Sequence, residues 1–152
     1  MRPFFGDNRF SSPETLATET RDSVVPPAWS CPFCSLPESR VVDEDDLALV
    51  VRDAFPVSQG HTLIVPRRHV ASFFSVTQEE RASIVRLLDR AQVALRCDHA
   101  LDGYNIGIDD GLAAGQTVPQ LHIHLIPRYI GDHDDPRGGV RWVLPGKAKY
   151  WS

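Results

Sequence analysis

Two histidines, His122 and His124, are separated by a single residue in the segment QLHIHLIPR, residues 120–128. Because side chains alternate between the two faces of a β-strand, we predict that both imidazoles and Gln120 project from one face. The imidazoles would then stand about 7 Å apart along the strand, a spacing at which both can contact one phosphate. His-x-His on a strand is also a metal-ligand pair, and a strand that merely carries two outward histidines is a third interpretation.

The residues that flank the two histidines favour phosphate. The preceding loop has the sequence GLAAGQTVP, residues 111–119, and includes Gln116 and Thr117; a Pro-Arg pair follows the histidines. Backbone N–H groups and hydroxyls in such a glycine-containing loop suit phosphate oxygens. We therefore interpret this segment as an anion-binding loop that leads into a histidine-bearing strand.

Hydrophobic periodicity predicts the elements that position this strand. Short apolar runs indicate strands over 47–52, 61–65, 104–109 and 121–127. Thr77 and Glu80 form a capping box that opens one long helix over 77–98. Apolar residues recur along this helix at spacings of three and four: Ile84, Leu87, Leu88, Ala91 and Leu95. Strands around one long helix predict an α+β fold, with an antiparallel sheet and the helix packed on one face.

Composition and the chain ends bound the function further. Residues 1–30 lack helical or strand periodicity and are interpreted as an N-terminal extension to a single domain, residues 31–152. The net charge of −4 provides no basic field for a nucleic-acid polymer, and no apolar run is long enough to cross a membrane. Three cysteines and the absence of a signal-peptide core predict a reducing, cytoplasmic location. We expect the C-terminal tail to pack on the domain, since Trp142 and Val143 would otherwise be exposed.

Cys31 and Cys34 have the C-x2-C spacing of half a zinc site. A redox pair is the alternative, although no thioredoxin-like βαβ pattern surrounds these cysteines. In the remaining interpretation, the two cysteines lie near the start of a strand and share no function.

Four segments together resemble the histidine triad family of nucleotide-binding proteins. They are the histidine segment (115–129), the strand and turn RDAFPVSQGHTLIVPRRHV (52–70), GYNIGIDDGLAAGQTV (103–118) and the tail DPRGGVRWV. The tail is similar to that of bacterial members of the polyphosphate-hydrolase branch. The resemblance covers roughly residues 30–145. It implies a sheet-and-helix protomer that forms a homodimer through its helix and a shared sheet.

The resemblance assigns roles to residues at matching positions. It implies that His122 attacks an α-phosphate to give a nucleotidyl-histidine, which water or another acceptor then resolves. His124 matches the last triad position, which contacts the phosphate or the leaving group. Gln116 and Thr117 match donors to phosphate oxygens, and Asp53 matches the acceptor for the ribose hydroxyls.

Two departures from the family pattern leave two hypotheses open. Gln120 stands where the first histidine is expected, and Asp109 replaces an amide residue near the phosphates. The first hypothesis is a hydrolase or transferase that cleaves nucleoside phosphoramidates or dinucleoside polyphosphates, with a purine base expected. The second is a nucleotide-binding module without turnover. We favour catalysis, because the attacking ring of the family donates to the main-chain carbonyl at the first position, which any side chain leaves in place.

The resemblance also implies a structural zinc that the chemistry does not require. Its ligands would be Cys31, Cys34, His69 and the first triad position, where Gln120 offers only a neutral amide oxygen. Water, Gln120 or nothing would complete the site. A third hypothesis follows, in which the chain is a zinc-stabilised interaction protein and its histidines are structural.

Overall fold

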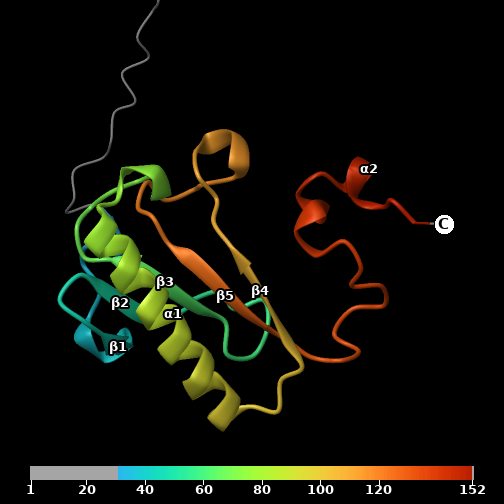
Figure 1. The fold of residues 1–152 in the computed structure, drawn as a ribbon, viewed down its shortest axis with the longest axis horizontal. Helices are drawn as coiled ribbons and strands as arrows, with labels where there is room; N and C mark the ends of the chain where they lie inside the picture. Colours follow the sequence, from blue (N-terminus) through green and yellow to red (C-terminus); the bar gives the residue numbers. More distant parts are fainter. Residues whose placement is uncertain (1–30, 152) are drawn as a thin grey trace, which may run out of the picture.

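The computed structural model describes residues 31–151, so the predicted N-terminal extension lies outside the described residues. One sheet contains five strands: β1 Val41–Glu44, β2 Ala48–Arg52, β3 Thr62–Pro66, β4 Gly103–Gly107 and β5 Ile123–Arg128. Their spatial order is β1-β2-β3-β5-β4, and every neighbouring pair is antiparallel. The long helix α1, Gln78–Asp98, lies across one face of this sheet (Figure 1). The predicted α+β fold is confirmed.

Helix α1 begins where its capping residues predict. The Thr77 side chain accepts a hydrogen bond from the Glu80 N–H, and the Glu80 carboxylate accepts one from the Thr77 N–H. These reciprocal bonds satisfy two backbone donors that the first turn would otherwise leave without partners. Four residues of the predicted apolar stripe are buried against the sheet, and Leu88 packs beside them.

Apolar clusters cover both faces of the central strands. On the helix face, Val50, Ile64 and Leu125 pack with the apolar stripe of α1. On the opposite face, Val51 and Leu63 belong to a second cluster, over which side chains of the segment 33–41 pack. This double coverage explains why β2 and β3 are continuous apolar runs rather than alternating ones.

The fold includes elements that sequence periodicity did not predict. Strand β1 has only four residues, two of them acidic, and half-buried residues alternate with exposed ones along it, so its apolar signal is weak. Short helical turns lie before β1, between later strands and near the C-terminus: η2 Glu38–Arg40, η3 Phe73–Ser75, η4 Leu112–Ala114, η5 Gly139–Val143 and α2 Pro145–Ala148. Within residues 31–151, no helix is both long and apolar enough to cross a membrane.

The expectation that the C-terminal tail packs onto the domain is wrong for most of the segment 131–151. This segment extends from the end of β5 and stands beside β4, away from α1 (Figure 1). Val143 is 77% exposed and Trp142 is 36% exposed. The segment is held mainly by its own contacts, such as the hydrogen bonds from the Arg141 guanidinium to the Lys147 and Ala148 carbonyls.

Candidate active site

The two histidines lie side by side at the start of β5, on the sheet face opposite α1. Their half-buried rings have centroids 5.0 Å apart, whereas Leu121, Ile123 and Leu125 are buried. The predicted alternation therefore holds for the histidines. His124 pairs with Leu63 of β3 and with Gly107 of β4. At Gly107, an added Cβ would meet no atom within 4 Å, so the space beside His124 is open.

The His122 ring is held so that one nitrogen is free for chemistry. Its Nδ1 lies 2.8 Å from the Gln120 carbonyl oxygen, which can only accept. We therefore assign the proton to Nδ1, which leaves the lone pair of Nε2 available. The Phe33 ring packs against the imidazole, with centroids 5.1 Å apart, and limits its rotation.

His124 is connected to a second histidine behind it. His61 Nε2 and His124 Nδ1 are 2.9 Å apart, and the Val57 N–H donates to His61 Nδ1 at 3.3 Å. Because His61 Nδ1 accepts, His61 Nε2 must carry the proton and donate it to His124 Nδ1. His124 therefore presents an Nε2–H donor at the site.

The electrostatic surroundings keep both of these rings neutral. Burial lowers the pKa of His61, and the nearby Asp53 carboxylate opposes this only in part. Burial also lowers the pKa of His124, and the neighbouring His122 and His61 lower it further, while Asp53 and Asp109 act in the opposite direction. Both rings are therefore neutral at pH 7, as the assigned hydrogen bonds require.

The predicted nucleotide-binding residues occupy different situations. One Asp53 oxygen accepts from the Phe55 N–H, and the other lies 3.4 Å from His61 Nδ1. The Gln116 amide bonds to the Gly111 N–H and the Ala71 carbonyl, so this side chain holds the loop that contains it. Thr117 is exposed, and Asp109 is half-buried near His124.

The structure separates the side chain of Gln120 from the two histidines. This side chain is 1% exposed, and its Oε1 accepts from the Val70 N–H at 3.1 Å. Its Nε2 donates to the Pro66 and Arg68 carbonyls at 3.0 and 3.1 Å. We therefore correct the expectation that Gln120 projects beside the histidines: only its main-chain oxygen contacts His122.

The sequence-predicted metal ligands are brought together. One ligand atom from each of Cys31, Cys34 and His69 lies within 4.8 Å of the others, and Cys34 Sγ is 3.2 Å from His69 Nδ1. Cys31 is buried and Cys34 is exposed; burial and the adjacent Cys31 raise the pKa of the Cys34 thiol. Two thiols and an imidazole are the ligand types that zinc prefers, so the group fits this metal.

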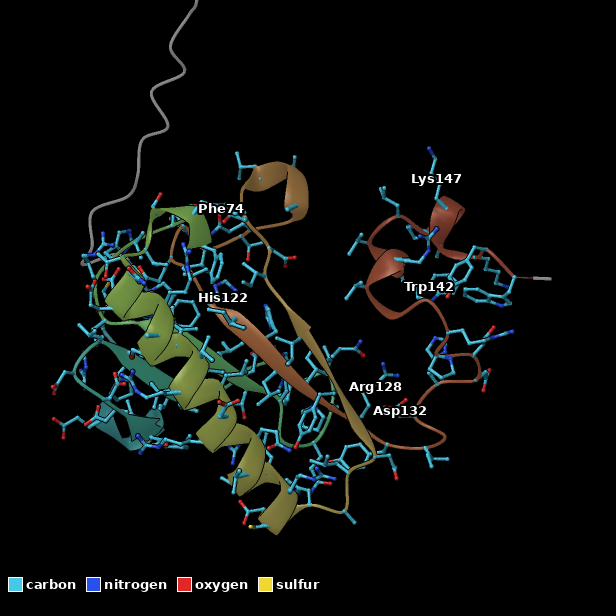
Figure 2. All side chains as sticks on the ribbon, viewed as in Figure 1. Phe74, His122, Arg128, Asp132, Trp142 and Lys147 are labelled. Atoms are coloured by element: carbon cyan, nitrogen blue, oxygen red, sulfur yellow. The ribbon has the colours of Figure 1, made fainter. Side chains whose placement is uncertain are left out.

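A cavity of about 640 Å³ lies between β4, β5 and the C-terminal segment, and neither histidine lines it. Its walls include Asn105, Arg128 and Trp142. The Arg128 guanidinium is bound by the Asp132 carboxylate, and Figure 2 shows the two side chains together. Trp142 and Lys147 lie well away from His122 in the same view (Figure 2). Because Arg128 is already paired, we assign the chemistry to the histidines rather than to this cavity.

Sequence reasoning passed over two residues of the site. No periodicity distinguishes a His61 that bonds to His124 from a buried histidine without function. Phe33 carried no signal beyond its position between two cysteines. The contact of each with a triad position depends on the pairing of segments that are distant in sequence.

Comparison with known proteins identifies the family. The sequence model of the HIT domain matches residues 37–131, more than half of the chain. The chain therefore belongs to the HIT, or histidine triad, family.

Individual relatives extend this finding. An uncharacterized HIT-like protein of Methanocaldococcus jannaschii is 36% identical over 106 residues, which cover 67% of this chain and 81% of that protein. The structure of a HIT family protein from Bacillus anthracis is 33% identical, with a TM-score of 0.63, over 67% of this chain and 75% of that one. A Zn-bound histidine triad family protein from Mycobacterium smegmatis is 31% identical, with a TM-score of 0.63, over 80% of this chain and 95% of that one.

Proposed function

We propose that the protein is a nucleotide hydrolase or transferase that acts at the α-phosphate of nucleoside phosphoramidates or dinucleoside polyphosphates. The observation that carries this proposal is the arrangement of the two triad rings. The Gln120 carbonyl holds the Nδ1 proton of His122 and leaves Nε2 as a nucleophile. His61 holds Nδ1 of His124 and leaves an N–H donor beside it. Membership of the HIT family supports nucleotide chemistry in general.

In the first step, Nε2 of His122 forms a bond to the α-phosphorus while the bond from phosphorus to the leaving group breaks. The leaving group departs with the bonding electron pair, as an amine that takes a proton from solvent or, from a dinucleoside polyphosphate, as the remaining nucleoside polyphosphate. The His124 Nε2–H donates to a non-bridging oxygen and stabilises the negative charge that develops there. In the second step, a water oxygen attacks phosphorus, the P–N bond breaks, its electron pair returns to Nε2, and a proton is released to solvent.

The rest of the nucleotide is placed by polar loops and an apolar wall. Thr117 is exposed and free to donate to a phosphate oxygen, and Asp53 remains the candidate acceptor for ribose hydroxyls. On the histidine face, the half-buried ring of Phe33, which packs against His122, offers an apolar surface to a purine base. The negative charge of Asp109 near His124 repels a phosphate. We therefore expect the substrate to approach from the side of His122, where this repulsion is weaker.

A nucleotide-binding module without turnover is the second candidate. It is favoured by the replacement of the first triad histidine and by the carboxylate of Asp109 near His124. This candidate and the enzyme share nucleotide binding and differ in the covalent step.

The covalent step therefore provides the test. Purified protein would be mixed with adenosine phosphoramidate or a diadenosine polyphosphate, quenched, and analysed by intact-protein and peptide mass spectrometry. We expect AMP release and an adenylyl group on His122, both abolished in His122→Ala. His133→Ala, at an exposed histidine of the C-terminal segment, is the matched control and should retain both. Equal turnover by the wild type and His122→Ala would refute the enzyme, and nucleotide binding without adduct would favour the binding module.

We also propose that Cys31, Cys34 and His69 bind a structural zinc. A Zn-bound protein among the similar structures supports this, as do the three adjacent ligand atoms. We also propose a reducing, cytoplasmic location, because an odd number of cysteines, three, argues against a disulfide framework.

We propose a homodimer as the working form of the protein. Strand β4 is at the edge of the sheet, and the neighbouring C-terminal segment exposes Val140, Val143 and Leu144. A free strand edge beside exposed apolar side chains favours pairing with a second copy. Light scattering coupled to size exclusion should give twice the mass of the chain, and Leu144→Asp should lower that mass toward one copy.

A further inference from the structure

We propose that Cys31, Cys34 and His69 form a metal centre with three protein ligands and an open fourth coordination position. This inference rests on the zinc proposed above and specifies how that centre is completed. Cys34 Sγ and His69 Nδ1 are 3.2 Å apart. Two electron pairs at this distance repel unless a proton or a cation lies between them. Tetrahedral zinc, with bonds of about 2.3 Å to sulfur and 2.0 Å to nitrogen, would separate the two atoms by roughly 3.5 Å.

Gln120 does not supply the fourth ligand. Its side chain makes three hydrogen bonds, to Val70, Pro66 and Arg68, in a buried environment. Turning the amide toward a metal would leave three backbone groups without partners, and a neutral amide oxygen is a poor zinc ligand. Within residues 31–151, no additional histidine, cysteine or carboxylate joins the group.

A cavity beside Cys34 has room for an outside ligand on the metal. Cys34 lines a cavity of about 650 Å³ whose walls include three carboxylates, Glu38, Asp43 and Glu44, and one guanidinium, Arg67. Asp43 is paired with Arg90 and Glu44 with Arg67, so no unpaired guanidinium among the described residues lines this cavity to attract an anionic ligand. We infer that water occupies the position and that a neutral nitrogen donor, such as imidazole, can replace it.

Cobalt substitution of the full-length protein, prepared without a histidine tag, tests this inference. Co²⁺ should give sulfur-to-cobalt charge-transfer bands from the two thiolates, and these bands should weaken in Cys34→Ala. Added imidazole should shift the visible d–d bands to a saturating end point while the charge-transfer bands persist. In Gln120→His, a fourth protein ligand should make the d–d bands insensitive to imidazole and tighten cobalt binding at least tenfold.

The outcomes separate this inference from the proposals on which it builds. If cobalt binds but imidazole leaves the d–d bands unchanged, the centre is closed and the inference is wrong, although the metal site stands. If imidazole bleaches the charge-transfer bands, it removes the ion instead of joining it, and the inference is also wrong. If neither cobalt nor zinc binds, the zinc proposal fails together with this one. Titration of the wild-type cobalt protein with imidazole tests the open position even if Gln120→His does not fold. None of these measurements depends on nucleotide turnover.

Discussion

The main-chain oxygen of Gln120 and its side-chain amide bond to different parts of the molecule. The oxygen accepts from His122, and the amide bonds to the segment 66–70 that leads to His69. The side chain therefore acts on stability, whereas the main-chain oxygen orients His122, the proposed nucleophile. This separation explains how glutamine at the first triad position is compatible with a correctly oriented His122.

A substitution at this residue tests the separation. Gln120→Ala removes three buried hydrogen bonds, so we expect the free energy of unfolding to fall by about 2–4 kcal/mol, measured by urea denaturation. Because the main-chain oxygen remains, kcat of the folded variant should fall less than tenfold. Gln78→Ala, at the exposed first position of α1, is the control and should change neither quantity. A large loss of kcat with unchanged stability would contradict the separation.

At the scale of the elements, Asp45 joins the turn between β1 and β2 to helix α1. Its carboxylate accepts from the Ser83 hydroxyl at 2.6 Å, from Arg86 at 2.9 Å and from the Leu47 and Ala48 N–H groups. Burial alone would raise the pKa of Asp45, but these donors together hold it well below its ordinary value. The hairpin at the edge of the sheet is thus fixed to the helix through one carboxylate.

Asp45→Ala should therefore loosen the hairpin. We expect the free energy of unfolding to fall by about 2–3 kcal/mol at pH 7, because Ser83 is fully buried and loses its partner. The depressed pKa of Asp45 contributes stability above the unfolded-state pKa of about 3.9, and this contribution is lost as the pH falls below it. The variant should approach the wild type in stability at low pH. Asp46→Ala, at the exposed neighbouring position, should leave both the stability and its pH dependence unchanged.

For the molecule as a whole, the neutral histidines make stability depend on pH. The pKa values of His61 and His124 are lowered in the folded state, chiefly by burial. Below the unfolded-state pKa of about 6.5, the unfolded chain therefore binds protons that the folded chain does not. The free energy of unfolding should be highest above pH 6.5 and should decrease as the pH falls through and below this value.

Urea denaturation between pH 7.5 and 5 measures this dependence. His61→Gln should show a shallower decrease than the wild type, because one buried ring no longer titrates. His133→Gln, at an exposed position, should keep the wild-type slope. If NMR titration placed the pKa of His61 above 6.5, the expected direction would be wrong.

The sequence predicted whatever depends on local periodicity and missed whatever depends on distant contacts. The capping box at Thr77 and the alternation along β5 are local, and both are confirmed. The orientation of the Gln120 side chain depends on one N–H group and two carbonyl groups that lie some 50 positions earlier in the chain. Hydrophobic periodicity carries no information about such distant partners. The exposure of the C-terminal segment is not predicted, because apolar residues such as Val143 indicate burial whether or not a surface of the domain covers them.

The residues of β4 that share a sheet face with His124 bear on the size of substrate that can reach this histidine. Gly103, Asn105 and Gly107 face the same side as Arg128, Ile126 and His124, their partners on β5. Two of these three positions lack side chains, so under the proposed function the approach to His124 is wide enough for a bulky leaving group. Gly107 lies directly opposite His124, and a Cβ added at Gly107 would meet no atom within 4 Å. Gly107→Val should therefore leave the melting temperature nearly unchanged and raise KM about tenfold for large leaving groups, with a smaller effect on an unsubstituted phosphoramidate.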